Sequence, residues 1–177
     1  MILDDVLVEP ITPEMMEEAK AIAEKLKVSL GQKTRAATEN RDIIGSLAHN
    51  AVENKLRSLG VTFESYRTKI GVTGDGGDIL YDGDLIDVKG THGKLDEKYF
   101  YNKSFLVFDK ELPRIESIGI SHFVFVQVDI EEQKAYIYGA IRFDDFMENS
   151  VPVTLQWENH GIKAYQLKPF INYVYRT

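Results

Sequence analysis

The sequence predicts a single α/β or α+β domain in which helices flank a mixed β-sheet. Its 177 residues suit one domain, and we find no internal repeat, low-complexity tract or linker that would divide them. The spacing of apolar residues along the chain predicts two helices, then several strands, a short helix and further strands. That order is typical of a sheet covered by helices.

Two helices are expected in the first third of the chain. Thr12-Pro13 can cap and begin the first helix, and apolar residues recur at helical spacing over positions 15–26. The polar stretch Gly31–Arg41 is expected to be a loop or a weak helix. An apolar stripe over 43–59 predicts the second helix, and Gly60 follows it as a C-terminal cap.

A β-hairpin is expected around Asp82-Gly83, because this dipeptide between apolar runs favours a two-residue turn. Its strands are Asp78–Tyr81 and Asp84–Lys89. Upstream, the alternating stretch Val61–Ile70 predicts another strand, and a glycine cluster over 71–77 separates it from the hairpin.

The rest of the chain predicts further strands and one short helix. The run His122–Ile130 is almost wholly apolar, which indicates a central strand. The remaining expected elements are a turn at 131–133, a strand over Lys134–Ile141, a helix over Phe143–Asn149, and strands over Val151–Trp157 and Ile162–Phe170 on either side of a turn at 158–161.

The hairpin places acidic residues opposite each other. A two-residue turn sets Tyr81 opposite Asp84, and therefore sets Asp78 opposite Asp87. Side chains alternate along a strand, so Asp78, Asp87 and Lys89 are expected on one face.

Two opposed carboxylates repel each other unless a cation lies between them. Hard oxygen ligands suit Mg²⁺ or Mn²⁺, and a neighbouring lysine can orient a water or stabilise a developing negative charge. The sequence therefore predicts chemistry suited to phosphodiester hydrolysis.

Asp78 followed by Asp87-Val88-Lys89 resembles the PD-(D/E)xK motif of the restriction-endonuclease-like nuclease superfamily, with Gly77 in place of the motif's proline. In that family a glutamate often lies on the helix before these strands, and Glu53 matches it. The resemblance covers roughly residues 43–142. Residues 12–40 would then be a helical extension, and 150–177 would add C-terminal strands to the same single domain.

The resemblance implies a restriction-endonuclease-like fold and a metal-dependent DNA endonuclease of the restriction, repair or resolvase, or phage or mobile-element type. It implies that Asp78, Asp87 and the backbone carbonyl of Val88 hold Mg²⁺ or Mn²⁺ and that Lys89 positions a water. Glu53 would assist a second metal or the water network. A homodimer is expected, since duplex cutters of this family often dimerise.

Two other readings of the chain stay open. The chain can be a non-catalytic member of the same fold that binds a nucleic acid or a protein. Alternatively, it has an unrelated fold in which these acids lie on the surface.

Several residues have structural alternatives to a functional role. Asp84 is a rival first acid, but it alternates to the opposite face from Asp87. Glu53 can instead pair with Arg57, one helical turn away. Gln127 is expected to be structural and His92 a loop residue. The stretch Tyr99–Lys103 can form core or can stack on nucleotides.

Composition excludes several classes of function. The chain has no cysteine, which rules out disulfide scaffolds, thiolate zinc sites and cysteine nucleophiles. No apolar run approaches the roughly 18–20 residues that span a bilayer, so no membrane partner is expected. Met1–Asp5 carries acids where a signal peptide would carry positive charge, and we therefore expect a cytoplasmic protein.

The net charge of −7 by itself argues against a nucleic-acid partner. Residues 53–114, however, carry 10 Lys/Arg and 11 Asp/Glu, so almost all of the negative excess lies elsewhere. The candidate phosphate contacts in this region are Lys55, Arg57, Arg67, Lys69, Lys94, Lys98 and Lys103.

Overall fold

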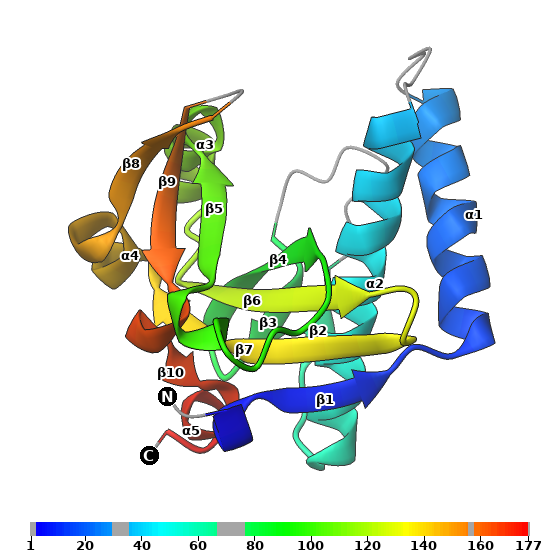
Figure 1. The fold of residues 1–177 in the computed structure, drawn as a ribbon, viewed down its shortest axis with the longest axis horizontal. Coiled ribbons are helices and arrows are strands. Elements are labelled where there is room, and N and C mark those ends of the chain that lie inside the picture. The colour runs from blue at the N-terminus through cyan, green and yellow to red at the C-terminus, as the bar shows by residue number, and fades with distance from the viewer. Residues whose placement is uncertain (1–2, 30–35, 67–76, 156–157, 177) are drawn as a thin grey trace.

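A seven-stranded mixed sheet runs through the centre of the computed structural model, which describes residues 3–29, 36–66, 77–155 and 158–176. Its order is β1-β7-β6-β4-β3-β2, and β10 also pairs with β7 (Figure 1). β4 and β6 are parallel, and the other pairs are antiparallel. These strands are β1 (Leu7–Pro10), β2 (Glu64–Ser65), β3 (Ile79–Tyr81), β4 (Asp84–His92), β6 (His122–Asp129), β7 (Lys134–Arg142) and β10 (Lys168–Pro169).

A second, three-stranded sheet has the order β5-β9-β8. In Figure 1 it lies on the opposite side of the molecule from helices α1 and α2. Its strands are β5 (Ser104–Phe108), β8 (Val151–Thr154) and β9 (Glu158–Lys163). The shorter helical elements are η1 (Leu3–Asp5), η2 (Phe100–Asn102), η3 (Asp109–Glu111), α3 (Leu112–Ser117), α4 (Phe143–Asn149), η4 (Ala164–Gln166) and α5 (Phe170–Tyr175).

The two long helices confirm most of the N-terminal prediction. α1 covers Pro13–Ser29, and Thr12 caps it by accepting a hydrogen bond at Oγ1 from the Met15 N–H (3.3 Å). α2 covers Ala36–Ser58, and Gly60 follows with a φ of +71°, which suits a glycine C-cap. Residues 36–41 of the expected loop or weak helix thus belong to α2, and 30–35 lie outside the described residues.

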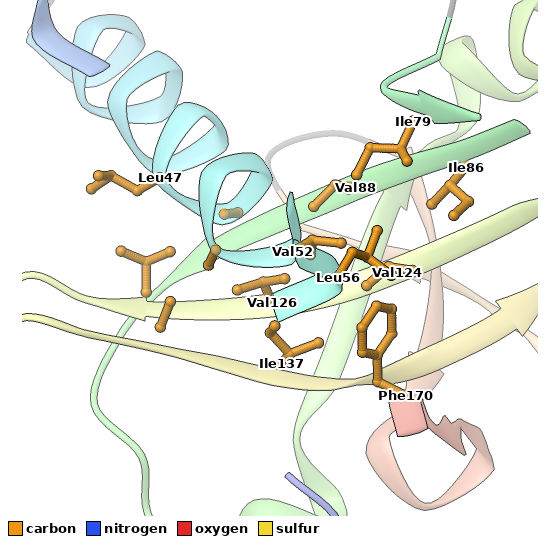
Figure 2. Packing of buried hydrophobic residues seen from close by; sticks show 14 of the residues in the cluster. Leu47, Val52, Leu56, Ile79, Ile86, Val88, Val124, Val126, Ile137 and Phe170 are labelled. Atoms are coloured by element: carbon orange, nitrogen blue, oxygen red, sulfur yellow. The ribbon is translucent and has the colours of Figure 1, made fainter. Parts of the chain in front are cut away.

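The large sheet is buried on both faces. On one face, Val52 and Leu56 of α2 pack on the sheet residues Val124 and Val126 (Figure 2). The opposite face carries an aromatic cluster in which Phe125 of β6 stacks on Phe105 of β5, with ring centroids 5.0 Å apart. Burial on both faces explains why the β6 sequence is apolar almost without alternation. The chain forms a single compact domain with a curled, mixed sheet between helices, which is the coarse class that the sequence predicts.

The predicted strand over Val61–Ile70 is wrong in its bounds. Val61 continues the end of α2, because its N–H donates to the carbonyl of Leu56 (3.3 Å). The strand expected over Val61–Ile70 is therefore limited to Glu64–Ser65 among the described residues, and 67–76 lie outside them.

The turn expected at 158–161 is instead the first part of β9. Asn and Gly in this segment suggest a turn, but β9 lies between β5 and β8 and pairs with both. Strand pairing on both edges therefore overrides the local turn preference. The strand β8 occupies the first part of the expected Val151–Trp157 strand. Ile162–Phe170 is divided among β9, η4 and β10 and ends at the first residue of α5.

The remaining predicted elements agree with the structure. The strands over His122–Ile130 and Lys134–Ile141 correspond to β6 and β7, and the short helix over Phe143–Asn149 is α4. Within the described ranges, no helix is both long enough and apolar enough to cross a membrane.

Candidate metal and phosphodiester site

The β3–β4 hairpin has the predicted turn and register. Tyr81 pairs with Asp84 and Ile79 pairs with Ile86. Asp82 and Gly83 both have positive φ values (50° and 84°), as a type I′ turn requires. The turn chemistry thus fixes which residues of β3 and β4 face each other.

The ladder ends one residue before the predicted Asp78–Asp87 pair. The Asp78 N–H donates to the Ile86 carbonyl (2.8 Å), and its carboxylate Oδ2 accepts a hydrogen bond from the Val88 N–H (2.7 Å). The Asp78 side chain thus takes the place of a backbone acceptor beside β4. This bond holds the carboxylate against the middle of the D-x-K segment.

Asp87 and Lys89 point away from α2. Ile86 and Val88 enter the core beneath α2, so the alternating residues Asp87 and Lys89 face the other side of the sheet. There the Lys89 ammonium lies 5.9 Å from the ring centre of Phe123. The side chains of Asp87 and Lys89 are only 15% and 20% exposed.

Lys89 lies between two carboxylates from different elements. Its Nζ is 2.8 Å from Asp87 Oδ2 and 3.2 Å from Glu111 Oε2, which η3 supplies. Burial would lower the pKa of Lys89, but these two carboxylates raise it above its ordinary value. Lys89 is therefore charged at neutral pH.

Asp87 carries an unfavourable negative charge. Burial, with a further contribution from the nearby Asp78 carboxylate, raises the pKa of Asp87 to about 6, although Lys89 acts in the opposite direction. Within the described part of the chain, no hydrogen bond of good geometry reaches the buried Asp87 Oδ2, and the Lys89 ammonium is its close charged neighbour. A cation beside the two aspartates would offset this cost.

Glu53 reaches the site through His49, one turn earlier on α2. His49 Nε2 lies 2.9 Å from Glu53 Oε1, and His49 Nδ1 lies 3.5 Å from Asp78 Oδ1. Glu53 also forms the predicted ion pair with Arg57 (2.6 Å). Glu53 therefore forms the ion pair with Arg57 that the structural alternative expects, and it is also linked through His49 to Asp78.

The pKa values of this chain of groups follow from its contacts. Burial acts to raise the pKa of Glu53, but hydrogen bonds with His49, Ser65 and Arg57 lower it to about 2. Burial likewise acts to raise the pKa of Asp78, and His49, the Val88 N–H and Lys89 lower it overall. Glu53 and Asp78 are thus carboxylates at neutral pH.

Sequence reasoning missed His49 and Glu111. His49 stands one helical turn before Glu53, and that spacing is a signal that could have found it. Glu111 is 22 residues from Lys89, in a short 3-10 helix. We find no local sequence pattern that indicates its contact with the lysine.

The side chains at this site fit a magnesium site that has only one or two protein ligands. Within the described ranges, no group of three or more His, Asp and Glu side chains has an arrangement that could hold a metal ion. Mg²⁺, however, commonly uses one or two carboxylates and completes its shell with waters and substrate oxygens. Asp78 and Asp87 match that requirement, because they supply two carboxylates that are close enough to interact with each other.

No protein-family model matches this chain. No curated protein matches it at a significant level either. Function must therefore be argued from the geometry of the site.

Asp84 is a structural residue rather than part of this site. Its carboxylate Oδ2 lies 2.8 Å from Arg176 Nη1 and 3.4 Å from both the Tyr173 hydroxyl and His122 Nδ1. These contacts join the start of β4 to α5 and β6.

Other predicted residues divide between core and surface. Gln127 is buried, donates to the Gly93 carbonyl (2.9 Å) and accepts from the Tyr138 hydroxyl (3.2 Å), so its role is structural. His92 is exposed and is the last residue of β4. In the aromatic stretch Phe100 is buried, whereas Tyr99 and Tyr101 are exposed.

Ion pairs reduce the set of candidate phosphate contacts. Lys55 pairs with Glu9, Arg57 with Glu53, and Lys94 with Glu131. Arg67 and Lys69 lie outside the described residues. Lys98 and Lys103 form no ion pair with the described part of the chain, which leaves them as the candidates of this set without a carboxylate partner there.

Proposed function

We propose that this protein is a metal-dependent DNA endonuclease of the PD-(D/E)xK type, with a restriction-endonuclease-like fold, that hydrolyses phosphodiester bonds. The observation that carries the proposal is the convergence of Asp78, Asp87 and Lys89, in which the pKa of Asp87 is raised to about 6 by burial and by Asp78. Such crowding of acids beside a charged lysine is typical of a site for a divalent cation and a phosphate.

Each residue then has a defined role. Asp78 and Asp87, with the Val88 carbonyl, would hold Mg²⁺ or Mn²⁺, which lowers the pKa of a bound water and neutralises charge at the leaving oxygen. Lys89 stays protonated, because Asp87 and Glu111 raise its pKa. It therefore orients the attacking water and stabilises the negative charge of the transition state, rather than acting as a base.

His49 and Glu53 support a metal ligand and do not bind the metal themselves. Glu53 is fixed by Arg57 and contacts His49, and His49 in turn faces Asp78 Oδ1. Partners of this kind orient ligands and tune their basicity. In this proposal Glu53 acts through His49 rather than as a direct ligand.

The test is cleavage of plasmid and oligonucleotide DNA with Mg²⁺ or Mn²⁺. We expect Asp87→Asn and Lys89→Gln each to reduce the cleavage rate at least about 100-fold, since the first removes a metal ligand and the second removes the cation that stabilises the transition-state charge. Asp84→Asn is the matched control, because it changes an aspartate of the same strand on the opposite face. Undiminished cleavage in both site variants would exclude this assignment. A symmetric double-strand break would support a homodimer with one site for each DNA strand.

One observation favours a second candidate, a non-catalytic member that binds a nucleic acid or a protein. Lys89 is already neutralised by Asp87 and Glu111, and such a closed ion-pair network can serve stability alone. Calorimetric titration with Mn²⁺ separates the two candidates. Binding that Asp87→Asn removes supports the nuclease, whereas no binding in the wild type supports the second candidate.

A further inference from the structure

The segment over residues 92–103 joins the end of β4 to the start of β5 and presents two aromatic rings to solvent. Tyr99 is 56% exposed and Tyr101 is 42% exposed. Between them Phe100 is buried, and its ring lies 4.3 Å from the Tyr101 ring. Burying Phe100 anchors the segment, so the two tyrosines are held on a fixed base while their rings stay accessible.

Two cations that have no carboxylate partner among the described residues accompany these rings. Lys98 Nζ lies 5.5 Å from the centre of the Tyr99 ring. Lys103 is partly buried beside Gly93, with its Nζ 3.9 Å from where a Cβ on that glycine would lie. Burial lowers the pKa of Lys103, and no carboxylate of the described residues acts against it. A partly buried ammonium of this kind gains from an anionic ligand.

The segment also contains two acidic residues, but neither forms an ion pair with Lys98 or Lys103. Asp96 caps the segment locally, since its Oδ1 accepts the Lys98 N–H (3.0 Å). Glu97 is exposed and lies beside it in the chain. These two carboxylates make the segment close to neutral overall, which favours a ligand with both a flat ring and a phosphate over a purely anionic one.

The segment continues from the candidate catalytic strand. Gly93 lies four residues beyond Lys89, which is roughly 13 Å along a strand at about 3.3 Å per residue. Gln127 and the Val128 carbonyl hold Gly93 by hydrogen bonds of 2.9 and 3.0 Å. Gln127 also bonds Tyr138, which belongs to the aromatic cluster on the Lys89 side of the sheet. A nucleic-acid strand with its reacting phosphate at Lys89 would therefore reach Lys103 within a few nucleotides.

We infer that the 92–103 segment binds an unpaired nucleic-acid strand next to the reacting phosphate, with bases stacked on Tyr99 and Tyr101 and a backbone phosphate at Lys103. This inference rests on the proposed function for the position of the reacting phosphate. Exposed aromatic rings bind unpaired bases with little sequence preference, because every base has a stacking face. A fully paired duplex offers no such face along its length. The inference therefore narrows the substrate to DNA that has a single-stranded stretch beside the cleaved bond.

The experiment measures binding without cleavage. A fluorescein-labelled single-stranded oligonucleotide and a blunt duplex of the same length are titrated with the wild-type protein in EDTA, and anisotropy is read. We expect tighter binding of the single strand. Tyr99→Ala and Tyr101→Ala should each weaken it about tenfold, which is within the range that removal of one stacking partner produces. Lys103→Gln should weaken binding of the single strand and reduce its dependence on salt.

The controls separate stacking from folding and from general surface charge. Tyr99→Phe keeps the ring and should bind as the wild type does. Tyr175→Ala removes a similarly exposed tyrosine (52%) that belongs to α5, and Lys168→Gln removes an exposed lysine outside the segment. Neither should change binding, and thermal melting checks that every variant is folded.

Equal or tighter binding of the blunt duplex, alanine variants that bind like the wild type, or no saturable binding by the wild type would each overturn the inference. These outcomes differ from failure of the proposed function. A protein that binds single strands through Tyr99 but never cleaves them keeps this inference and loses the nuclease assignment. A protein that cleaves DNA independently of Tyr99 does the reverse.

Discussion

At the scale of single residues, the candidate site depends on groups that neutralise one another in a chain. Arg57 contacts Glu53, Glu53 contacts His49, and His49 faces Asp78. On the other side of β4, Lys89 joins Asp87 to Glu111. Each of the two acids that would bind a metal thus has a side-chain neighbour, His49 for Asp78 and Lys89 for Asp87. Changing His49 tests the site without removing a ligand.

His49 gives the first prediction at this scale. His49→Ala should weaken Mn²⁺ binding about 10–100-fold, because loss of a residue that orients a ligand typically has this effect. His49→Gln keeps a hydrogen-bonding group and should recover part of the affinity. Calorimetric titration measures both variants. Unchanged affinity in His49→Ala would show that Asp78 does not depend on His49.

Glu53 gives a prediction for the pH dependence of stability. Its pKa is about 2 in the folded protein and 4.5 ordinarily. The folded state therefore favours the carboxylate, and the stabilisation is complete above about pH 4.5 and is lost as the pH falls towards 2. It amounts to at most about 3 kcal/mol.

Urea unfolding of Glu53→Gln between pH 6 and pH 3 checks this sign. The wild type should lose more unfolding free energy over this range than the variant does, because the variant has no carboxylate to protonate at position 53. Parallel curves for the two proteins would show that the hydrogen bonds of Glu53 contribute nothing to stability.

At the scale of elements, the contact between α2 and β4 sets the position of the site. Gly90 allows that contact: a Cβ there would lie 2.9 Å from Ala48 Cβ and 3.0 Å from the Ile44 carbonyl oxygen. Both neighbours belong to α2, the helix that carries His49 and Glu53. The glycine directly after Lys89 therefore controls how closely these residues approach Asp78.

Gly90→Ala should destabilise the protein by about 1–3 kcal/mol, the usual cost of forcing a methyl group into a packed contact. It should also weaken Mn²⁺ binding, since α2 must move away from β4. Gly45→Ala is the matched control within α2, because nothing lies within 4 Å of a Cβ at that position. That substitution should leave metal binding unchanged and stabilise the helix by up to about 1 kcal/mol.

At the scale of the whole molecule, the C-terminal helix α5 packs into the same hydrophobic core as the N-terminal helices α1 and α2. Phe170 is fully buried within the cluster under α2, as Figure 2 shows beside Ile137 and Val124. α5 is also tied to the hairpin, since the Tyr81 hydroxyl donates to the Val174 carbonyl (2.7 Å) and Arg176 pairs with Asp84. The site hairpin and the chain terminus are thus parts of one cooperative unit.

Phe170→Ala should therefore lower the free energy of unfolding by about 3–5 kcal/mol, as loss of a large buried ring does. Urea denaturation followed by both far-UV circular dichroism and tyrosine fluorescence should show one common transition. Tyr175→Ala, which changes a ring that is 52% exposed, should alter stability by no more than about 0.5 kcal/mol. Separate transitions for the two probes would contradict a single cooperative unit.

The hairpin could be predicted from sequence because its signals are local. Asp82-Gly83 determines the turn, and the turn determines the pairing of Ile79 with Ile86. The departure at Asp78 could not be predicted in the same way, since it depends on a carboxylate accepting the Val88 N–H. Side-chain hydrogen bonds to the backbone compete with the ladder and leave no periodic signal.

The misjudged segments were those in which tertiary contacts override composition. Asn159 and Gly161 suggest a turn, yet strand pairing on both edges makes them part of β9. Glu111 reaches Lys89 only because β5 brings η3 back to the sheet. Contacts between elements that are distant in the sequence determine both features. The periodicity of residues within one element therefore could not predict them.

The pairing of β1 with β7 has a consequence for how the chain acquires its fold during synthesis. Leu7 pairs with Ile137, 130 residues later. At a ribosomal rate of about 5–20 residues per second, roughly 7–26 s pass between the two strands. For that interval the first strand lacks the strand it pairs with, although α2 can already pack on β4 once residues 84–92 have been made. In nascent chains of this protein the pairing edge of β1 therefore stays open until β7 has been synthesised.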